Sequence, residues 1–444
     1  MTTKIIPDQP RIIRAWTMYD WANSVYNLVI TTTFFPIYFL AVTKSAYGED
    51  TVPFLGMTFK NSPLYQYTLS IAYLSIALLL PILSSIADSR GSKKRFMQFF
   101  CYMGGLGCIG LFWFKGEQPS VEWGILCFIL ATIGYCGSLV FYNSYLPEIA
   151  SLENQDRVSA RGFAMGYIGA VILQMVGFAL VLYFSSKGDK VSGPLITFLL
   201  VGLWWIGFAQ ITFIRLPSPP KRAKHGHNMW VDGFVELRKV WHKLKGLPQL
   251  RSYLASFWFY SMGVQTVMLA ATMFGQKTLG LPPDKLIVTV VLIQLVAIAG
   301  AFLMSRLSRS YGNLRVLMGV VLFWVVICIS AYEVAMLKEK GYSAEFYFYG
   351  LAVAVGLVMG GIQALSRSTY SKLMPATEDT ASFFSFYDVT EKIAIVIGTF
   401  TFGYIDDILG MKHSVLSLIV FFAFGFIGLV LTNRIKTQET SSQT

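Results

Sequence analysis

The sequence predicts an all-α membrane protein whose twelve transmembrane helices form two six-helix bundles. Three observations lead to this prediction. The 444 residues are 55% hydrophobic and only 14% charged, whereas a soluble protein of this size carries about a quarter charged residues. Apolar runs of about 20 residues, the length that crosses a hydrocarbon core of about 30 Å, recur along the chain. One long polar segment divides these runs into two groups of six.

The predicted spans are, in chain order, 18–42, 64–86, 96–114, 123–146, 160–184, 194–214, 252–274, 284–305, 315–337, 346–366, 381–404 and 413–432. The expected domains are an N-terminal six-helix bundle over 1–214, a cytoplasmic linker with an amphipathic helix over 215–251, and a C-terminal six-helix bundle with a short cytoplasmic tail over 252–444.

Lysines and arginines predict the orientation, because they accumulate in cytoplasmic loops. With the N terminus inside, 25 of the 36 fall on the inner side, ten fall outside, and Lys392 falls within a span. Both termini are therefore expected in the cytoplasm, and the bacterial inner membrane is the expected location. The first 15 residues are polar and basic without a small-residue cleavage site, so we expect no secretory signal peptide.

Several classes of function are disfavoured by what the sequence lacks. The net charge of +12 is distributed as a membrane surface requires, so nucleic acid is not an expected partner. The five cysteines lie in apolar runs, which is typical of small buried residues. No metal-ligand spacing, phosphate-binding loop or hydrolytic constellation is present. We therefore expect no metal, no cofactor, no catalytic residue and no enzymatic activity.

The linker between the two predicted bundles begins with a Pro-rich basic stretch, which favours an extended chain. Apolar residues then recur at alternating spacings of four and three: Trp230, Phe234, Leu237, Trp241 and Leu244. The basic residues opposite them are Arg238, Lys239, Lys243 and Lys245. This pattern predicts an amphipathic helix that either lies on the inner leaflet or packs against the cytoplasmic ends of the bundles. Binding of a regulatory partner is a third interpretation.

The first span opens with YDWANSVYN. At about 100° per residue, five polar side chains share an arc of about 100°: Asp20, Asn23, Ser24, Asn27 and Thr31. Unpaired amides and carboxylates cost several kcal/mol each in hydrocarbon. The stripe is therefore expected to face the bundle interior or a wet cavity. A helix-end position near the interface is the alternative for Asp20, but Asn23 and Asn27 lie too deep for it.

The predicted eleventh span carries charges. Ser385, Asp388, Glu391, Lys392 and Thr399 lie within an arc of about 120°. Asp388 and Lys392 are four residues apart, so they can pair on one helix face. Glu391 then lacks an obvious local cation, and such a carboxylate in a low-dielectric place is a candidate proton carrier. The alternative is a static tie between this group and an arginine, Arg161 or Arg367.

Single polar residues in other spans complete the predicted cavity. Asn143 lies at the inner end of span four. Gln265 and Gln363, in spans seven and ten, either contact the solute or form interhelical hydrogen bonds worth about 1 kcal/mol or less. Gly162, Gly166 and Gly169 of span five are better explained by close helix packing than by ligand binding.

The loop after span two reads SSIADSRGSKKR. It resembles the signature of the loop between spans two and three of the major facilitator superfamily. Asp88, Arg90, Gly91, Lys93 and Lys94 fit this signature, with serines at the usual first glycine and first basic positions. The resemblance implies a gating charge network that latches the cytoplasmic side shut. An ordinary positive-inside loop would explain the cations but not the combination of Asp88 with Gly91.

A related segment, SRLSRSYGNLR, follows span eight. It keeps Gly312 and Arg315 but has Arg309 where the signature expects an acid. This second copy supports a repeat that relates the two halves. The missing acid raises the question of whether a matching latch exists there.

Five further segments occur in the same order as in one branch of the superfamily. They are YDWANSVYN, FYNSYLPEIA, RGFAMGYIG, GGIQALSRS and FFSFYDVTEKIA. Together they resemble the branch of autophagy-related vacuolar amino-acid effluxers and their bacterial homologues. The resemblance implies a major facilitator fold and a role in solute transport.

The functional hypothesis is a secondary active transporter that moves a small polar solute, with an amino acid suspected, by alternating access with proton coupling. Asp20, Asn23, Asn27, Asn143, Gln265, Gln363 and Lys392 are the expected substrate-binding residues, and Asp388 and Glu391 are the expected proton carriers. The expected partners are the solute, protons and membrane lipids, and we expect a monomer. The alternatives are an uncoupled facilitator, a non-transporting receptor or scaffold, and a membrane-embedded enzyme.

Overall fold

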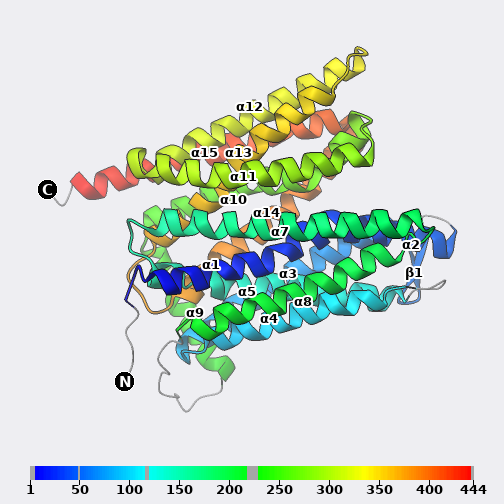
Figure 1. Ribbon diagram of the computed structural model, residues 1–444. Coiled ribbons are helices and arrows are strands. Elements are labelled where there is room, and N and C mark those ends of the chain that lie inside the picture. Colours follow the sequence, from blue (N-terminus) through cyan, green and yellow to red (C-terminus); the bar gives the residue numbers. More distant parts are fainter. Residues whose placement is uncertain (1–5, 49–50, 116–119, 218–228, 442–444) are drawn as a thin grey trace. The chain divides into compact units, whose positions relative to one another are not determined.

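The computed structural model describes residues 6–48, 51–115, 120–217 and 229–441 (Figure 1). The chain divides into two compact units. The first unit comprises Met1–Tyr145 and Met165–Gly233, and the second comprises Leu146–Ala164 and Phe234–Thr444. A short stretch before and within the fifth long helix thus groups with the C-terminal helices, and the rest of that helix belongs to the first unit.

The first unit is helical apart from one hairpin. Its helices are α1 (Pro10–Val25), α2 (Phe35–Tyr47), α3 (Asn61–Ser89), α4 (Lys93–Gly110), α5 (Val121–Asn143), most of α7 (Gln155–Ser186) and α8 (Ser192–Arg215). A π-helical segment, Tyr26–Phe34, joins α1 to α2, and a short 3₁₀ turn, Leu111–Trp113, follows α4. Strands β1 (Thr51–Phe54) and β2 (Met57–Lys60) pair antiparallel, with Val52 opposite Phe59.

The second unit contains α6 (Leu146–Ile149), the first turns of α7, most of α9 (Met229–Lys245), α10 (Pro248–Met273), α11 (Pro283–Tyr311), α12 (Asn313–Glu339), α13 (Glu345–Leu373), α14 (Thr380–Leu409) and α15 (Met411–Ser441). A second π-helical segment, Phe274–Thr278, follows α10. The Pro-rich part of the predicted linker lies mostly outside the described residues.

Eleven helices among the described residues are long and apolar enough to cross a membrane. They coincide with eleven of the predicted spans. The predicted span 381–404 lies in α14, which does not meet the same standard because charged side chains recur along it: Asp388, Glu391, Lys392, Asp406 and Asp407. That α14 crosses the membrane therefore stays a prediction.

The outward side of α14 nevertheless has the character of a lipid-facing surface. Five large side chains at helical spacing are exposed there: Ile393, Ile397, Phe400, Tyr404 and Ile408. They fall within about 80° of arc at 100° per residue, opposite the buried charged residues Asp388 and Lys392. This division between an apolar exposed face and a polar buried face is what a membrane-spanning helix with an internal site requires.

Small residues allow the helices of each unit to approach closely. A methyl group added at Gly360 of α13 would collide with the backbone of Ala297 on α11. In the first unit, methyl groups at Gly166 and Gly169 would meet Ser24 and the carbonyl of Trp21. These contacts confirm the close-packing interpretation of the two glycines of α7 and place that helix beside the polar part of α1.

Candidate functional site

Asp20 is the buried carboxylate of α1, and its side chain is held by the end of α5. The Tyr142 hydroxyl donates a hydrogen bond of 2.7 Å to Asp20 Oδ2. Trp16 positions this tyrosine, because the two rings stack with centroids 4.4 Å apart and the indole N–H donates to the Tyr142 carbonyl at 2.9 Å. Asn143 is buried in the same last turn of α5. α1 and α5 thus bring two of the predicted binding residues to one end of the unit's polar interior.

Asn23 and Thr31 belong to the same predicted polar stripe, and each has a buried polar atom without a hydrogen-bond partner among the described residues. Asn23 is 1% exposed and Thr31 is 2% exposed. Among the described residues, neither Asn23 Nδ2 nor Thr31 Oγ1 has a hydrogen-bond partner. Buried polar atoms normally find partners, and those that lack one mark places where a ligand or water can bind. Asn27, between them, is half-buried.

The π-helical segment that contains Asn27 was not predicted from the sequence. It is accompanied by threonine hydroxyls, because Thr32 Oγ1 and Thr33 Oγ1 both donate to the Leu28 carbonyl, at 2.8 and 2.9 Å. Gln174 of α7 donates to Thr33 Oγ1 at 3.0 Å, so this glutamine forms an interhelical hydrogen bond. π-Helical turns often occur at functional sites, and the run of three threonines was the only local signal for this one.

The charged residues of α14 form a compact group in the second unit. Lys392 Nζ lies 2.8 Å from Glu391 Oε2 and 3.4 Å from Asp388 Oδ1. The Lys392 and Asp388 side chains are each 4% exposed, and that of Glu391 is 21% exposed. The predicted pairing of Asp388 with Lys392 is therefore present. We call these three residues the charged triad.

The expectation that Glu391 lacks a local cation is wrong. Lys392 lies closer to Glu391 than to Asp388, because adjacent side chains on this helix bend toward each other, and Gln265 of α10 donates a second contact of 2.9 Å to Glu391 Oε1. The carboxylate short of a partner is instead that of Asp388. Its Oδ2 is buried and has no hydrogen-bond partner among the residues that the structure describes.

α10 contacts the charged triad, and α13 contacts α10 one turn away. Gln363 of α13 donates to Met268 Sδ at 3.1 Å, and Met268 lies one turn beyond Gln265 on α10. Gln265 of α10 thus contacts the triad directly, whereas the contact of Gln363 is with α10. Stacking of Phe257 on Tyr387, with centroids 4.3 Å apart, fixes α14 against α10 nearby.

Hydroxyl groups extend this polar interior from α10 to α13. Tyr260 shares a hydrogen bond of 2.7 Å with Ser366 Oγ, and Tyr253 donates to the Ser366 carbonyl at 2.9 Å. Arg367, the next residue, donates through Nε to Ser159 Oγ at 2.9 Å and lies 4.2 Å from the centre of the Phe163 ring. These contacts of Arg367 lead to the start of α7.

The loop after α3 has the tight turn that the motif predicts. Gly91 has φ of +60°, a conformation that favours glycine. Its amide donates to the Asp88 carbonyl at 3.2 Å, and the Ser92 amide donates to the Ala87 carbonyl at 2.8 Å. This pair of bonds is a Schellman motif, which closes the C terminus of a helix. The glycine therefore ends α3 within one residue of the buried Asp88.

The cations that follow this turn contact other parts of the first unit. The Lys93 ammonium lies 4.2 Å from the centre of the Tyr145 ring, and Lys94 Nζ donates to the Leu216 carbonyl at 2.6 Å. These contacts tie the turn to the ends of α5 and α8. Arg90 caps α3 directly after its last residue, Ser89.

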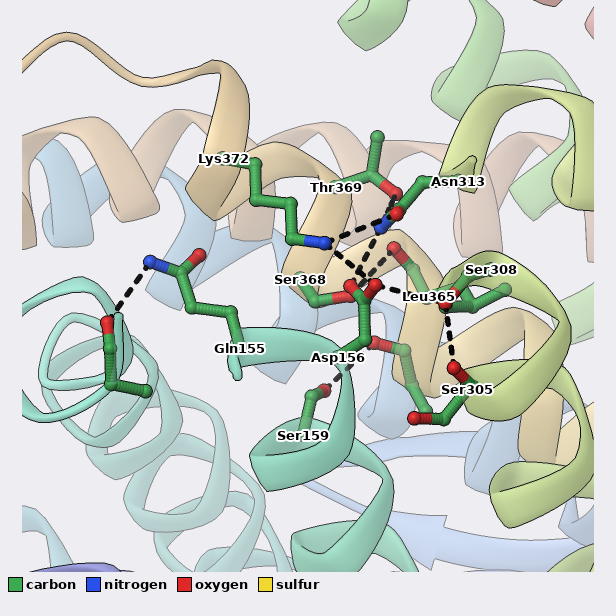
Figure 2. Close-up of polar contacts among 12 residues, drawn as sticks. Gln155, Asp156, Ser159, Ser305, Ser308, Asn313, Leu365, Ser368, Thr369 and Lys372 are labelled. Atoms are coloured by element: carbon green, nitrogen blue, oxygen red, sulfur yellow. Dashed lines mark hydrogen bonds and ion pairs between the residues drawn. The ribbon is translucent and has the colours of Figure 1, made fainter. Parts of the chain in front are cut away.

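Asp156 is a functional candidate that the sequence did not indicate. It lies in the first turn of α7 and accepts from Lys372 Nζ at 2.6 Å, from Asn313 Nδ2 at 2.7 Å and from Ser308 Oγ at 2.8 Å (Figure 2). Ser308 and Asn313 flank Gly312 in the second copy of the turn motif. The acid that this copy lacks at Arg309 is thus supplied from another helix.

Further contacts hold the same segment in the second unit. Ser159 Oγ donates to the Ala364 carbonyl at 2.7 Å, and Thr380 Oγ1 donates to Glu148 Oε1 at 3.0 Å. Lys372 also donates to Asn313 Oδ1 at 3.1 Å (Figure 2). We refer to Asp156, Ser308, Asn313 and Lys372 as the Asp156 cluster. The second copy of the turn motif lacks its expected acid at Arg309. In the Asp156 cluster, a carboxylate and a lysine nevertheless meet at this turn.

The structure groups the predicted residues into two sets. Asp20, Asn23, Asn27 and Asn143 belong to the first unit, and Gln265, Gln363, Asp388, Glu391 and Lys392 belong to the second. Within the described residues, no group of three or more His, Cys, Asp or Glu side chains is arranged to hold a metal ion. All five cysteines are buried and free, which confirms their interpretation as small apolar residues.

Solved structures show the class of protein to which this arrangement of helices belongs. The human organic anion transporter MFSD10 (TETRAN) matches with a TM-score of 0.73 at 13% identity, over 96% of this chain and 100% of that one. The major facilitator superfamily transporter FucP in its outward conformation matches with a TM-score of 0.67 at 14% identity, over 96% and 99%. The fold is that of the major facilitator superfamily.

Sequence relatives show the family. Residues 8–442 match the family described as "Vacuole effluxer Atg22 like". The "Uncharacterized MFS-type transporter YxiO" of Bacillus subtilis is 30% identical over 437 residues, which cover 97% of this chain and 96% of that protein. Autophagy-related protein 22 of Kluyveromyces lactis is 27% identical, over 90% of this chain and 89% of that protein. The chain belongs to the Atg22-like family and is a multi-pass membrane transporter, as its motifs predicted.

Proposed function

We propose that the protein moves a small polar solute, with an amino acid as the favoured candidate, by alternating access coupled to protons. A zwitterion suits the residues available, because the first unit offers a carboxylate with amides and the second offers carboxylates with a cation. The name of the family model, an effluxer family, supports transport of a solute. Alternating access is the mode by which transporters of this fold present one site to each side in turn.

The charged triad is the observation that carries the proton coupling. Two carboxylates and one ammonium within 3.4 Å bear one net negative charge when all are ionised. An uncompensated charge is costly in a buried, low-dielectric place, so binding of a single proton neutralises the group. Asp388 takes this proton, because Glu391 is already held by Lys392 and Gln265 whereas Asp388 Oδ2 has no partner among the described residues.

Lys392 connects proton and solute in this scheme. While Asp388 is ionised, the Lys392 ammonium is shared between two carboxylates. Once Asp388 is protonated, it no longer competes with Glu391 for Lys392, and the ammonium becomes available to a carboxylate on the solute. The second unit is therefore proposed as the part of the site that senses the proton.

The first unit is proposed as the part that recognises the solute. Asp20, oriented by Tyr142, accepts from an ammonium or hydroxyl group of the solute. Asn23 Nδ2, a buried donor without a partner among the described residues, binds a solute oxygen. Asn27 and Asn143 supply further amides. Gln265 and Gln363 complete the set from α10 and α13.

Two turn regions are proposed as gates. Asp88, Arg90, Gly91, Lys93 and Lys94 control the cytoplasmic side, where the Gly91 turn fixes Asp88 and the two lysines. The Asp156 cluster holds the start of α7 in the second unit, and opening of the cytoplasmic side requires its release. The same scheme places both termini in the cytoplasm of a bacterial cell, with the protein in the inner membrane as a monomer.

Proteoliposomes test this function. A thermal-shift screen against amino acids, peptides, sugars and nucleosides first selects a solute, and the pH dye pyranine inside the vesicles then reports proton movement. We expect the selected solute to move protons, and Asp388→Asn to retain exchange of solute for solute while losing accumulation driven by a pH gradient. Glu339→Gln, which breaks an exposed ion pair with Lys412, is the control. Solute flux without proton movement would establish the uncoupled facilitator instead.

A further inference from the structure

The helix α9 is attached to the second unit by one of its faces. Val240 and Leu244 are buried, at 0% and 4% exposed. Lys243 Nζ lies 2.8 Å from Asp379 Oδ2, and the Trp241 ring lies 5.7 Å from that of Phe386. Asp379 directly precedes α14. The sequence left open whether this helix lies on the inner leaflet, packs against the bundles or binds a partner. For this face, packing against the protein is correct.

A neighbouring face of α9 combines exposed aromatic and basic side chains, and Trp241 lies at its border with the attached face. Phe234, Arg238, Trp241 and Lys245 fall within about 60° of arc at 100° per residue, and all four are exposed. The expectation that Arg238 and Lys245 lie opposite the aromatic residues is therefore wrong. Phe234 is 56% and Trp241 is 46% exposed. The Lys245 ammonium lies 5.6 Å from the centre of the Trp241 ring. We call these four residues the outer face of α9.

The connection to α10 keeps the C-terminal end of α9 close to the membrane surface. α9 ends at Lys245 and the membrane-spanning helix α10 begins at Pro248, so only Gly246 and Leu247 separate them. Two extended residues reach about 7 Å. A helix tethered this closely to a span lies at the depth of the lipid headgroups, where Trp and Phe are favoured and where Lys and Arg meet lipid phosphates.

We propose that the outer face of α9 docks on the anionic phospholipid headgroups of the adjacent leaflet. Phe234 and Trp241 enter the boundary between headgroups and acyl chains, and Arg238 and Lys245 pair with phosphate groups. The occupant is an anionic lipid surface, because apolar and cationic side chains alternate on one stripe and a membrane is within reach. Through the Lys243–Asp379 ion pair, the docked helix holds the N-terminal end of α14, the helix of the charged triad.

A spin label beside the outer face tests this proposal on the full-length protein. Val235→Cys offers one exposed thiol next to the face without removing any of its four residues, and the five native cysteines are buried. The labelled protein is placed in nanodiscs of phosphatidylcholine alone or with phosphatidylglycerol. With the anionic lipid, we expect the label to collide with oxygen and to be shielded from a water-soluble nickel chelate, which is the signature of immersion in lipid.

Charge removal sharpens the test. Each basic residue near an anionic surface contributes roughly a fivefold change in binding, so Arg238→Gln and Lys245→Gln should each lower the ratio of immersed to water-exposed label about fivefold. The control is Lys187→Gln with Lys190→Gln, which removes two exposed cations from the loop after α7 and should change nothing. A label that meets the nickel chelate equally in both lipids overturns the proposal. A label shielded from both oxygen and nickel also overturns it, because a protein then covers the face.

Discussion

Asp20 in the first unit and Asp388 in the second are both carboxylates buried in helices of a membrane protein, but their contacts differ in kind. Asp20 accepts from the neutral Tyr142 hydroxyl at 2.7 Å, whereas Asp388 faces the Lys392 ammonium at 3.4 Å and competes for it with Glu391. A neutral hydroxyl orients a carboxylate without changing the local charge. A shared cation instead makes the charge of one carboxylate depend on protonation of the other. This difference supports the proposed division, in which the first site recognises the solute and the second links its transport to a proton.

The largest expected effect is on the first site. Asp20→Asn should reduce solute transport to the level of protein-free vesicles, because the amide keeps the size of the side chain but cannot bind a cationic group. Uptake into proteoliposomes and the melting temperature of the purified protein measure transport and folding separately. Asp189→Asn, a change in the exposed turn before α8, is the control. Loss of folded protein instead of transport would assign Asp20 a structural role.

Removing the cation of the second site should lower the stability of the protein. Lys392→Met leaves two buried carboxylates without their cation, and loss of one partner of a buried pair costs about 3–5 kcal/mol. The melting temperature should fall clearly, and adding Glu391→Gln to the same chain should restore much of it. Lys412→Met removes the partner of the exposed Glu339 and should cost about 1 kcal/mol or less. Equal losses in the two lysine variants would contradict the view that the triad is a coupled buried group.

A smaller effect should separate orientation from charge at the first site. Tyr142→Phe removes the hydrogen bond to Asp20 but keeps the ring stacked on Trp16. A hydrogen bond to a charged group contributes about 1.5–3 kcal/mol, so solute affinity should fall by roughly tenfold or more while its pH dependence is unchanged. Titration calorimetry measures both. Tyr38→Phe, which loses a hydroxyl contact to the Phe114 carbonyl, is the matched control, and an equal loss there would show a general packing effect.

Local signals in the sequence were sufficient for much of the fold. Length and hydropathy located eleven spans, because lipid imposes one length on every crossing helix. Gly91 predicted the turn after α3, because few other residues adopt a positive φ. The i,i+4 spacing of Asp388 and Lys392 placed them on one helix face. The charged residues of α14 indicated a site in the sequence. The same residues keep α14 outside the eleven described helices that are long and apolar enough to cross a membrane.

Features that depend on distant residues could not be predicted. Asp156 is an ordinary first-turn acid in the sequence, and its partners Ser308, Asn313 and Lys372 are 152 to 216 positions away. In the π-helical segment, two threonine hydroxyls donate to one carbonyl. The spacing of 100° per residue that holds for a regular α-helix therefore does not apply from Tyr26 onward. The contact of Glu391 with Lys392 depends on side-chain directions that helix periodicity does not specify.

The most direct test of the division between the two sites is the pH dependence of solute binding to purified protein. Calorimetric titrations across pH 5 to about 8 should show the affinity of the unaltered protein changing by up to tenfold per pH unit, as linkage to one proton requires. Asp388→Asn should bind the solute with an affinity that does not vary with pH, and Asp20→Asn should not bind it at any pH. An Asp388→Asn protein that keeps the original pH profile would contradict the proposed role of the charged triad.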